Sequence, residues 1–188
     1  MQEPDDHALM ISFQERGDSD AFEEIFRRHK GGLHGFLLQL SGDAAVAEEV
    51  SQQTWLKLIE LAEGRRYRPS AAFRTLLYTM ARNRWLDEHV RKARALPMDE
   101  VEAEVLELPL DAPDVGELLS RRQGEARLSR ALSSLPAEQR EVVALWMQGF
   151  ALVEVAEITG ARWHTVVSRK RYALEKLRQA LLPAAQEG

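Results

Sequence analysis

The chain has 188 residues, a hydrophobic fraction of 45%, a formal net charge of −5 and no cysteine. This length allows one ordinary domain or two small ones, and the lack of thiols excludes disulfides and thiolate metal sites. The acidic N-terminus is unlike a signal peptide, and no apolar run approaches the roughly 20 residues of a membrane helix, so we expect a cytoplasmic protein without membrane insertion.

Charge is unevenly distributed along the chain. Residues 1–24 carry eight acids against one base, and residues 65–94 carry nine bases against two acids. Residues 95–120 carry eight acids and no base, after which residues 162–178 are basic again. Net acidity alone argues against a nucleic-acid binder, but two basic blocks in an acidic chain indicate localised contact with a polyanion.

The first elements in chain order are helical. Residues 9–14 predict a short helix, and Asp18 or Ser19 is suited to cap the next one. Apolar residues then recur at helical spacing. Gly31 and Gly32 weaken this helix before a second apolar stripe continues it.

Two longer helices and a basic loop follow. Asp43 is expected to cap a helix that runs up to Gly64. The loop of residues 64–72 is rich in arginine, and Pro69 prevents a continuous helix through it. Residues 73–94 then predict a long helix with one apolar face.

An acidic linker is predicted next. Residues 95–120 contain three prolines and no sustained period, with at most a transient helical turn at residues 101–106. We therefore expect a flexible tether that becomes ordered only with a partner.

The C-terminal part predicts four more helices. The first covers residues 123–132, and Pro136 marks the start of the second, which ends at Gly149. A short helix ends at Gly160, and the last helix covers residues 163–182. With few strand signals and no internal repeat, the sequence predicts an all-α protein with two small helical domains.

The helices around Gly160 have the order of a helix-turn-helix, whose second helix reads bases in the major groove. Its inner stripe is Val166, Ala173, Leu177 and Leu181. Its opposite face carries His164, Ser168, Arg171, Tyr172 and Glu175, which can meet base edges. Bases placed to meet phosphates are Arg162, Arg169, Lys170, Lys176 and Arg178. The alternative is an amphipathic surface helix with solvated arginines.

Two side chains of this last helix need their own interpretation. Trp163 favours packing at the helix start over base stacking, because tryptophan mostly contributes buried area. Lys170 falls in a gap of the inner stripe, where its stem can lie along the core while its ammonium reaches outward.

These residues resemble a known family. Residues 132–181 are similar to the fourth domain of bacterial sigma factors, the promoter-specificity subunits of RNA polymerase, and residues 21–40, 47–64 and 72–95 are similar to the second domain. Two such domains without the third are typical of the extracytoplasmic-function (ECF) group. The resemblance implies a second-domain helical bundle at 8–94, an acidic linker at 95–121 and a fourth-domain helix-turn-helix at 122–184.

The resemblance implies a polymerase-docking helix. The family pattern of an acid, an aliphatic, any residue, Gln, an acid, any residue and an aromatic matches residues 49–55, with Gln53 where an acid is usual. Expected contacts with the β′ clamp are Glu49, Gln52, Gln53 and Trp55. From the residues alone, the acids at 48 and 49 would suit a solvated helix start.

It also implies a surface for the minus-ten promoter element. The Ala81-Arg82-Asn83 triplet and Asp87 match the family's DNA helix, and loop 64–72 matches the one that holds a flipped base. Expected contacts are Arg65, Arg66, Tyr67, Arg68, Arg82, Asn83, Arg84, Asp87 and Arg91. Tyr67 is expected to stack on a base. The alternatives are a polar surface residue for Asn83 and a half-buried loop aromatic for Tyr67.

For the minus-thirty-five element, the usual Pro-x-Gly-Thr-Val entry reads Arg162-Trp163-His164-Thr165-Val166. Expected contacts are Arg162, His164, Val167, Ser168, Arg169, Arg171 and Tyr172. A basic residue is common where Val167 stands, so an unusual promoter sequence is expected, with contact to a thymine methyl.

The sequence therefore predicts an alternative sigma factor with no catalytic residue, cofactor or metal. The expected partners are promoter DNA, core RNA polymerase through its β′ clamp and β flap, and an anti-sigma factor. The alternatives are a sigma-like decoy that sequesters an anti-sigma factor and a repressor that uses only the C-terminal helices. An enzyme is disfavoured because the five histidines form no metal-spaced or triad-like set and no glycine-rich phosphate loop is present.

Overall fold

The computed structural model describes residues 4–69, 72–95 and 127–181, with only the backbone described for 89–95. Every regular element in these ranges is a helix, which confirms the predicted all-α class. The expected linker, apart from Ala95 at the end of the last N-terminal helix, and the turn at 101–106 lie outside the described residues.

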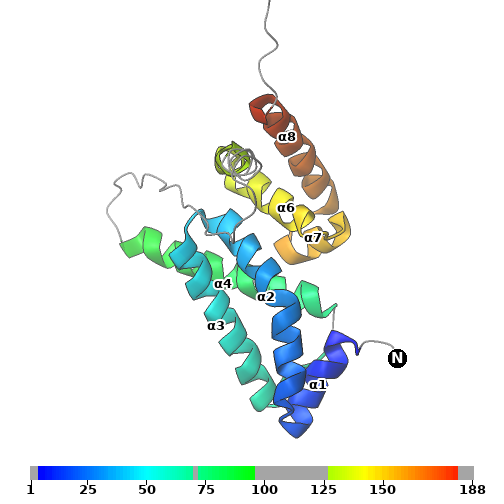
Figure 1. Cartoon of the computed structure of the whole chain (residues 1–188). Coiled ribbons are helices and arrows are strands. Elements are labelled where there is room, and N and C mark those ends of the chain that lie inside the picture. The colour runs from blue at the N-terminus through cyan, green and yellow to red at the C-terminus, as the bar shows by residue number, and fades with distance from the viewer. Residues whose placement is uncertain (1–3, 70–71, 96–126, 182–188) are drawn as a thin grey trace, which may run out of the picture.

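Four helices form the N-terminal unit: α1 (Asp6–Arg16), α2 (Ser19–Ser41), α3 (Ala44–Glu63) and α4 (Phe73–Ala95). They pack together in the lower part of Figure 1, where α1 lies beside α2 and α4 contacts both α2 and α3. Their core contains fully buried side chains such as Ile25, Phe36, Leu58 and Leu77.

Local signals explain where these helices begin and end. The Asp18 carboxylate accepts a hydrogen bond from the Ala21 N–H at 3.2 Å, and Asp43 caps α3 in the same way. Gly17 and Gly42 end α1 and α2 with φ of 67° and 70°, the left-handed region that glycine adopts without strain. The predicted boundaries are confirmed to within a few residues.

The glycine pair at 31 and 32 does not interrupt α2, which is one continuous helix of 23 residues. At Gly32 a Cβ atom would lie 2.8 Å from the Tyr78 Oη atom of α4 and 3.1 Å from the Gln148 Oε1 atom of the C-terminal unit. This close approach accounts for the absence of a side chain.

The C-terminal unit contains helical residues 127–133, α6 (Ala137–Met147), α7 (Leu152–Thr159) and α8 (Trp163–Leu181). One cluster of this unit is its own and includes Leu132, Leu135, Val143, Ala173 and Leu177. Three of the four predicted inner-stripe residues of α8 are buried, namely Val166, Ala173 and Leu177.

The two units also share a core. In Figure 1, α6 and α7 lie next to α2 and α4, and the packing pairs are α6 with α2 and α7 with α4. Phe150 is buried, and its ring centroid lies 4.8 Å from that of Tyr78. The sequence predicted two domains on a tether, but nothing in it indicated that they pack against each other.

Candidate nucleic-acid interface

The basic loop between α3 and α4 exposes three arginines, Arg65, Arg66 and Arg68. Arg65 has φ of 51°, an uncommon value for a residue with a side chain. The Arg68 guanidinium donates to the Arg65 and Tyr67 carbonyl oxygens at 2.9 Å each. The loop is thereby held in a turn that presents positive charge to solvent.

The expected base-stacking ring does not lie on this surface. Tyr67 is only 2% exposed, its hydroxyl bonds to the His7 Nδ1 atom, and its backbone N–H donates to the Gln14 Oε1 atom at 3.0 Å. Burial raises the pKa of the Tyr67 phenol. The prediction that Tyr67 offers a face to a base is therefore wrong for this structure, because the ring anchors the loop to α1.

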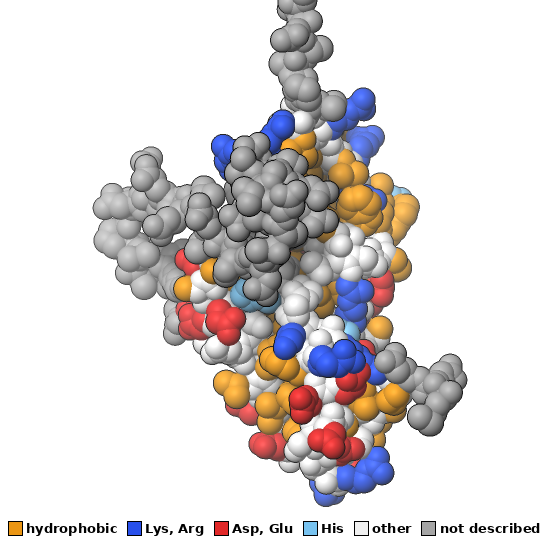
Figure 2. Space-filling model, viewed as in Figure 1, with side chains coloured by type: hydrophobic (Ala, Val, Ile, Leu, Met, Phe, Trp, Pro, Cys, Tyr) orange, Lys and Arg blue, Asp and Glu red, His pale blue; other side chains and the backbone are white. Residues whose placement is uncertain are grey.

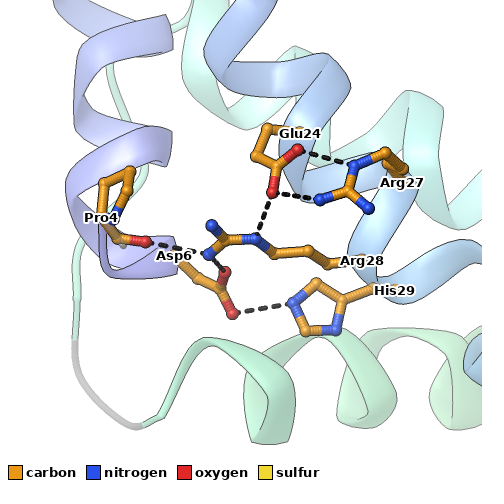
Figure 3. A network of polar contacts seen from close by, with 6 residues as sticks. All are labelled: Pro4, Asp6, Glu24, Arg27, Arg28 and His29. Atoms are coloured by element: carbon orange, nitrogen blue, oxygen red, sulfur yellow. Dashed lines mark hydrogen bonds and ion pairs between the residues drawn. The ribbon is translucent and has the colours of Figure 1, made fainter. Parts of the chain in front are cut away.

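The helix that anchors the loop is itself fixed by the ionic network of Figure 3. The Asp6 carboxylate accepts from the Arg28 Nη1 atom at 2.9 Å and lies 2.7 Å from the His29 Nε2 atom. Arg28 also donates to Glu24, and hydrogen bonds from Arg27 and Arg28 lower the pKa of Glu24 to about 2. This network ties the start of α1 to α2.

Helix α4, which follows the loop in the chain, presents a second group of polar side chains. Asn83, Arg84 and Asp87 are exposed, whereas Arg82 is partly buried. The Arg84 Nε atom donates to the Gln53 Oε1 atom of α3 at 2.5 Å. The side chain of Arg91 lies outside the described residues.

The helix-turn-helix of α7 and α8 turns at Gly160, where φ is 65°. Val166, on the inner side of α8, is fully buried, and side chains expected to read bases lie on the opposite, exposed face of the same helix. These exposed residues are His164, Ser168, Arg171 and Tyr172, and Arg162, which was expected to meet phosphates, is exposed just before α8 begins. Val167 is half-buried, and Arg169 pairs with Glu138 of α6 at 3.1 Å.

The Arg171 Nη2 atom donates to the Tyr172 hydroxyl at 3.1 Å, and the Arg171 guanidinium carbon lies 4.9 Å from the centroid of that ring. This contact limits the directions in which Arg171 can point. The two side chains therefore act as one polar group on the exposed face of α8.

Apolar side chains gather beside this exposed face. Trp163 is 50% exposed, so the prediction that it packs at the helix start is wrong. Trp146, Met147 and Val153 are also exposed, and Figure 2 shows hydrophobic side chains gathered on the C-terminal helices. Lys170 is half-buried, and its Nζ atom lies 3.9 Å from the centroid of the Trp146 ring, so its ammonium group rests on an aromatic face.

The predicted docking helix, α3, exposes Glu49 and Gln52. Gln52 and Gln53 each donate to the glutamate one turn earlier, at 2.8 and 3.1 Å. Trp55 is mostly buried against Phe26, and the distance between the ring centroids is 5.1 Å. Of the four residues, Trp55 therefore supports the surface more than it forms it.

A groove of about 300 Å³ lies between α2 and α3 beside this surface. Trp55 lines it together with Lys30, His34 and Gln52. The Trp55 Nε1 atom is buried without a hydrogen-bond partner among the described residues. The groove is therefore lined by aromatic rings of α2 and α3 together with charged and polar side chains.

Sequence reasoning missed the residues that join the two units, notably Arg74, Glu141 and Phe150. Glu141 carried a signal, because this acid directly precedes the apolar run of α6 and lies one helical turn before Leu145, on a face where burial is expected. Among the described residues, no three His, Cys, Asp or Glu side chains are grouped to hold a metal ion. No helix in the described ranges is long and apolar enough to cross a membrane.

Comparison with known proteins gives consistent matches. Residues 25–95 match the family model described as Sigma-70 region 2. The chain is 32% identical over 174 residues to the ECF RNA polymerase sigma factor RpoE of Cereibacter sphaeroides, with 92% of each chain covered. It is 33% identical over 168 residues to the RNA polymerase sigma factor CarQ of Myxococcus xanthus, with 88% of this chain and 91% of the relative covered.

Solved structures show the same fold. The sigma factor RpoE in complex with the anti-sigma factor NepR from Bartonella quintana matches with a TM-score of 0.65 and 22% identity, over 85% of this chain and 96% of that chain. CnrH in complex with the cytosolic domain of CnrY matches with a TM-score of 0.64 and 20% identity, over 94% and 97% of the two chains.

Proposed function

The chain belongs to the family of ECF RNA polymerase sigma factors and directs transcription initiation as an alternative sigma factor, and we propose that it reads promoters with α4 and α8. Its role is regulatory rather than catalytic. The observation that carries the proposal is the two-sided character of α8, where Val166 is buried and Arg171 and Tyr172 are exposed on the opposite face.

The minus-thirty-five element is assigned to α8. Arg171 and Ser168 suit hydrogen bonds to base edges, and Val167 suits a thymine methyl. His164 and Tyr172 lie on the same side, while Arg162 and Arg169 suit the phosphates. Since Trp163 is exposed at the start of α8, it joins this surface as an apolar contact to the sugar and phosphate groups.

The minus-ten element is assigned to the loop and α4. Asn83 has both a donor and an acceptor for an unpaired base, and Asp87 is exposed one turn later. Arg84 and the loop residues Arg65, Arg66 and Arg68 suit the single-strand backbone. Arg82 belongs to this surface once it is released from Glu141. Arg91 is assigned to this surface from the family resemblance. Tyr67 is assigned to supporting the loop.

Core polymerase is assigned to α3 and to the groove beside it. Glu49 and Gln52 provide exposed polar contacts to the β′ clamp, and Trp55 provides the groove wall. Gln53, which stands where an acid is usual, instead holds Arg84 and so links the docking helix to the DNA helix. The fourth-domain surface that includes Trp146 and Met147 is assigned to the β flap.

The further assignments follow from the family. An anti-sigma factor is proposed as a partner, because the solved RpoE structure that shares this fold is bound to such a factor. We also propose a cytoplasmic location and the division of the chain into 8–94, 95–121 and 122–184.

Run-off transcription with bacterial core polymerase over a promoter library tests the proposal. Asn83→Ala and Arg171→Ala should each lower output about tenfold to a hundredfold, the loss of about 1–3 kcal/mol expected for one base contact. Gln179→Ala is the control, because Gln179 is exposed two turns after Arg171 on the same helix and has no assigned contact.

Failure to associate with core polymerase would refute the proposed function. Association without any transcript would instead favour the decoy. The isolated chain should bind duplex DNA negligibly at physiological salt, since its net charge is −5 and each domain reads only one element.

A further inference from the structure

A buried ion pair joins the two helical units. The Arg82 Nε atom of α4 donates to the Glu141 Oε1 atom of α6 at 2.5 Å, and the side chains are 17% and 8% exposed. Separating the units would return both charges to water, whereas removing one partner would leave the other charge buried and unpaired. The pair therefore makes the contact between the units specific to one geometry.

A second contact lies at the other end of the same interface. The Arg74 Nη2 atom donates to the Gln148 carbonyl oxygen, and the Arg74 guanidinium carbon lies 4.2 Å from the centroid of the Phe150 ring. Phe150 is almost fully buried and also packs on Tyr78. This cation–π contact holds α4 to the segment between α6 and α7.

The backbone of α2 is shaped for the same contact. The Gln148 side chain approaches Gly32 and Gly35, whose missing Cβ atoms would lie 3.1 and 3.8 Å from its amide atoms. A larger side chain at Gly32 would push α6 away. Charge, aromatic packing and close backbone approach thus agree on one closed arrangement.

This arrangement is too short to read a promoter. The minus-ten and minus-thirty-five elements, numbered from the transcription start, are centred about 25 base pairs apart. This separation is about 85 Å of duplex at about 3.4 Å per base pair. A compact chain of 188 residues has a radius of gyration of about 16 Å and a diameter of about 40 Å. The two units must separate before one chain can contact both elements.

We propose that the structure is a closed state of the free chain, in which Glu141 occupies Arg82 of the minus-ten surface and opening exchanges Glu141 for DNA phosphate. With its Nε atom held and its side chain mostly buried, Arg82 presents little surface to a phosphate in this state. The competition with DNA rests on the proposed function, whereas the closed state itself does not.

The distance between the units tests the closed state directly. Because the chain has no cysteine, Lys57→Cys and Gln179→Cys give two unique labelling sites, both exposed, one on α3 and one on α8. Pulsed electron resonance on the full chain should give one short distance distribution. Glu141→Gln and Arg74→Ala should each increase the open population at least about tenfold.

Glu157→Gln is the matched control, since it makes the same change at an exposed carboxylate of α7 and should leave the distances unchanged. Circular dichroism identifies any variant that loses helix. If Glu141→Gln loses helix, Arg74→Ala still tests the interface from the other unit. Long distances in the unmodified background, or folded variants that both stay closed, would overturn the closed state.

Transcription tests the competition with DNA. At limiting chain concentration, Glu141→Gln and Arg74→Ala should reach half-maximal output at about tenfold lower concentration, because fewer molecules are held closed. Variants that open without this gain would overturn the competition. An unmodified chain that is closed but supports no transcript would refute the proposed function and uphold the closed state.

Discussion

Replacing Gly32 with alanine should destabilise the protein relative to the same change at Gly31. Both residues lie inside α2, so both changes gain about 1 kcal/mol of helix propensity. At Gly31 a Cβ atom meets nothing within 4 Å, whereas at Gly32 it would lie 2.8 Å from the Tyr78 Oη atom. Tyr78 cannot move away easily, because its ring is buried between Phe36 and Phe150.

Overpacking of this kind costs about 1–3 kcal/mol, so the free energies of unfolding of the two variants should differ by about that amount. For a chain of this size, about 2 kcal/mol corresponds to about 4–8 °C in Tm. Urea denaturation and thermal melting followed by circular dichroism measure both quantities.

Gly35→Ala provides the control, since its Cβ atom would make an ordinary contact at 3.8 Å and the variant should behave like Gly31→Ala. Equal stability of the variants at Gly31 and Gly32 would show that Tyr78 moves aside freely. The close approach of α2 and α4 would then not explain the glycine.

Three other predictions concern caps and ionisation. Asp43→Ala removes the acceptor for two backbone N–H groups at the start of α3 and should lower the free energy of unfolding by about 1 kcal/mol, measured in urea. Hydrogen bonds from two arginines depress the pKa of Glu24 from 4.5 to about 2, so its stabilising contribution is present above pH 4.5 and is lost as pH falls toward 2. Glu24→Gln should therefore flatten the acid side of the stability profile, and an unchanged slope would contradict this pairing. Burial raises the pKa values of Tyr67 and Tyr78, so these phenols ionise first in the unfolded chain and stability should fall above about pH 10. An ultraviolet pH titration of the folded protein in which Tyr67→Phe and Tyr78→Phe remove signal near pH 10 would refute this.

Much of the candidate site was predictable because its placement follows from helix periodicity. Arg171 and Ser168 lie opposite Val166 on any regular helix, so their exposure follows once one face is buried. The exposure of Asn83 and Asp87 was expected for the same reason. The sequence showed that Gln53 stands where the family usually has an acid. It did not show the hydrogen bond between Gln53 and Arg84, because the two residues lie on different helices.

The sequence by itself determined the helices, their ends and the family. Asp18, Asp43, Gly17, Gly42 and Gly160 act through neighbours within a few residues, and such local interactions are encoded in the order of the residues. Only the tertiary structure decided which side chains are available.

Tyr67 is buried because α1, more than 50 residues earlier in the chain, supplies its partners, and Trp163 is exposed because no helix in the described ranges covers it. Arg82 is held because Glu141, 59 residues away, reaches it across the interface between the units. Burial and ion pairing depend on segments that are distant in sequence, and their meeting is set by the summed packing of whole helices rather than by any local pattern.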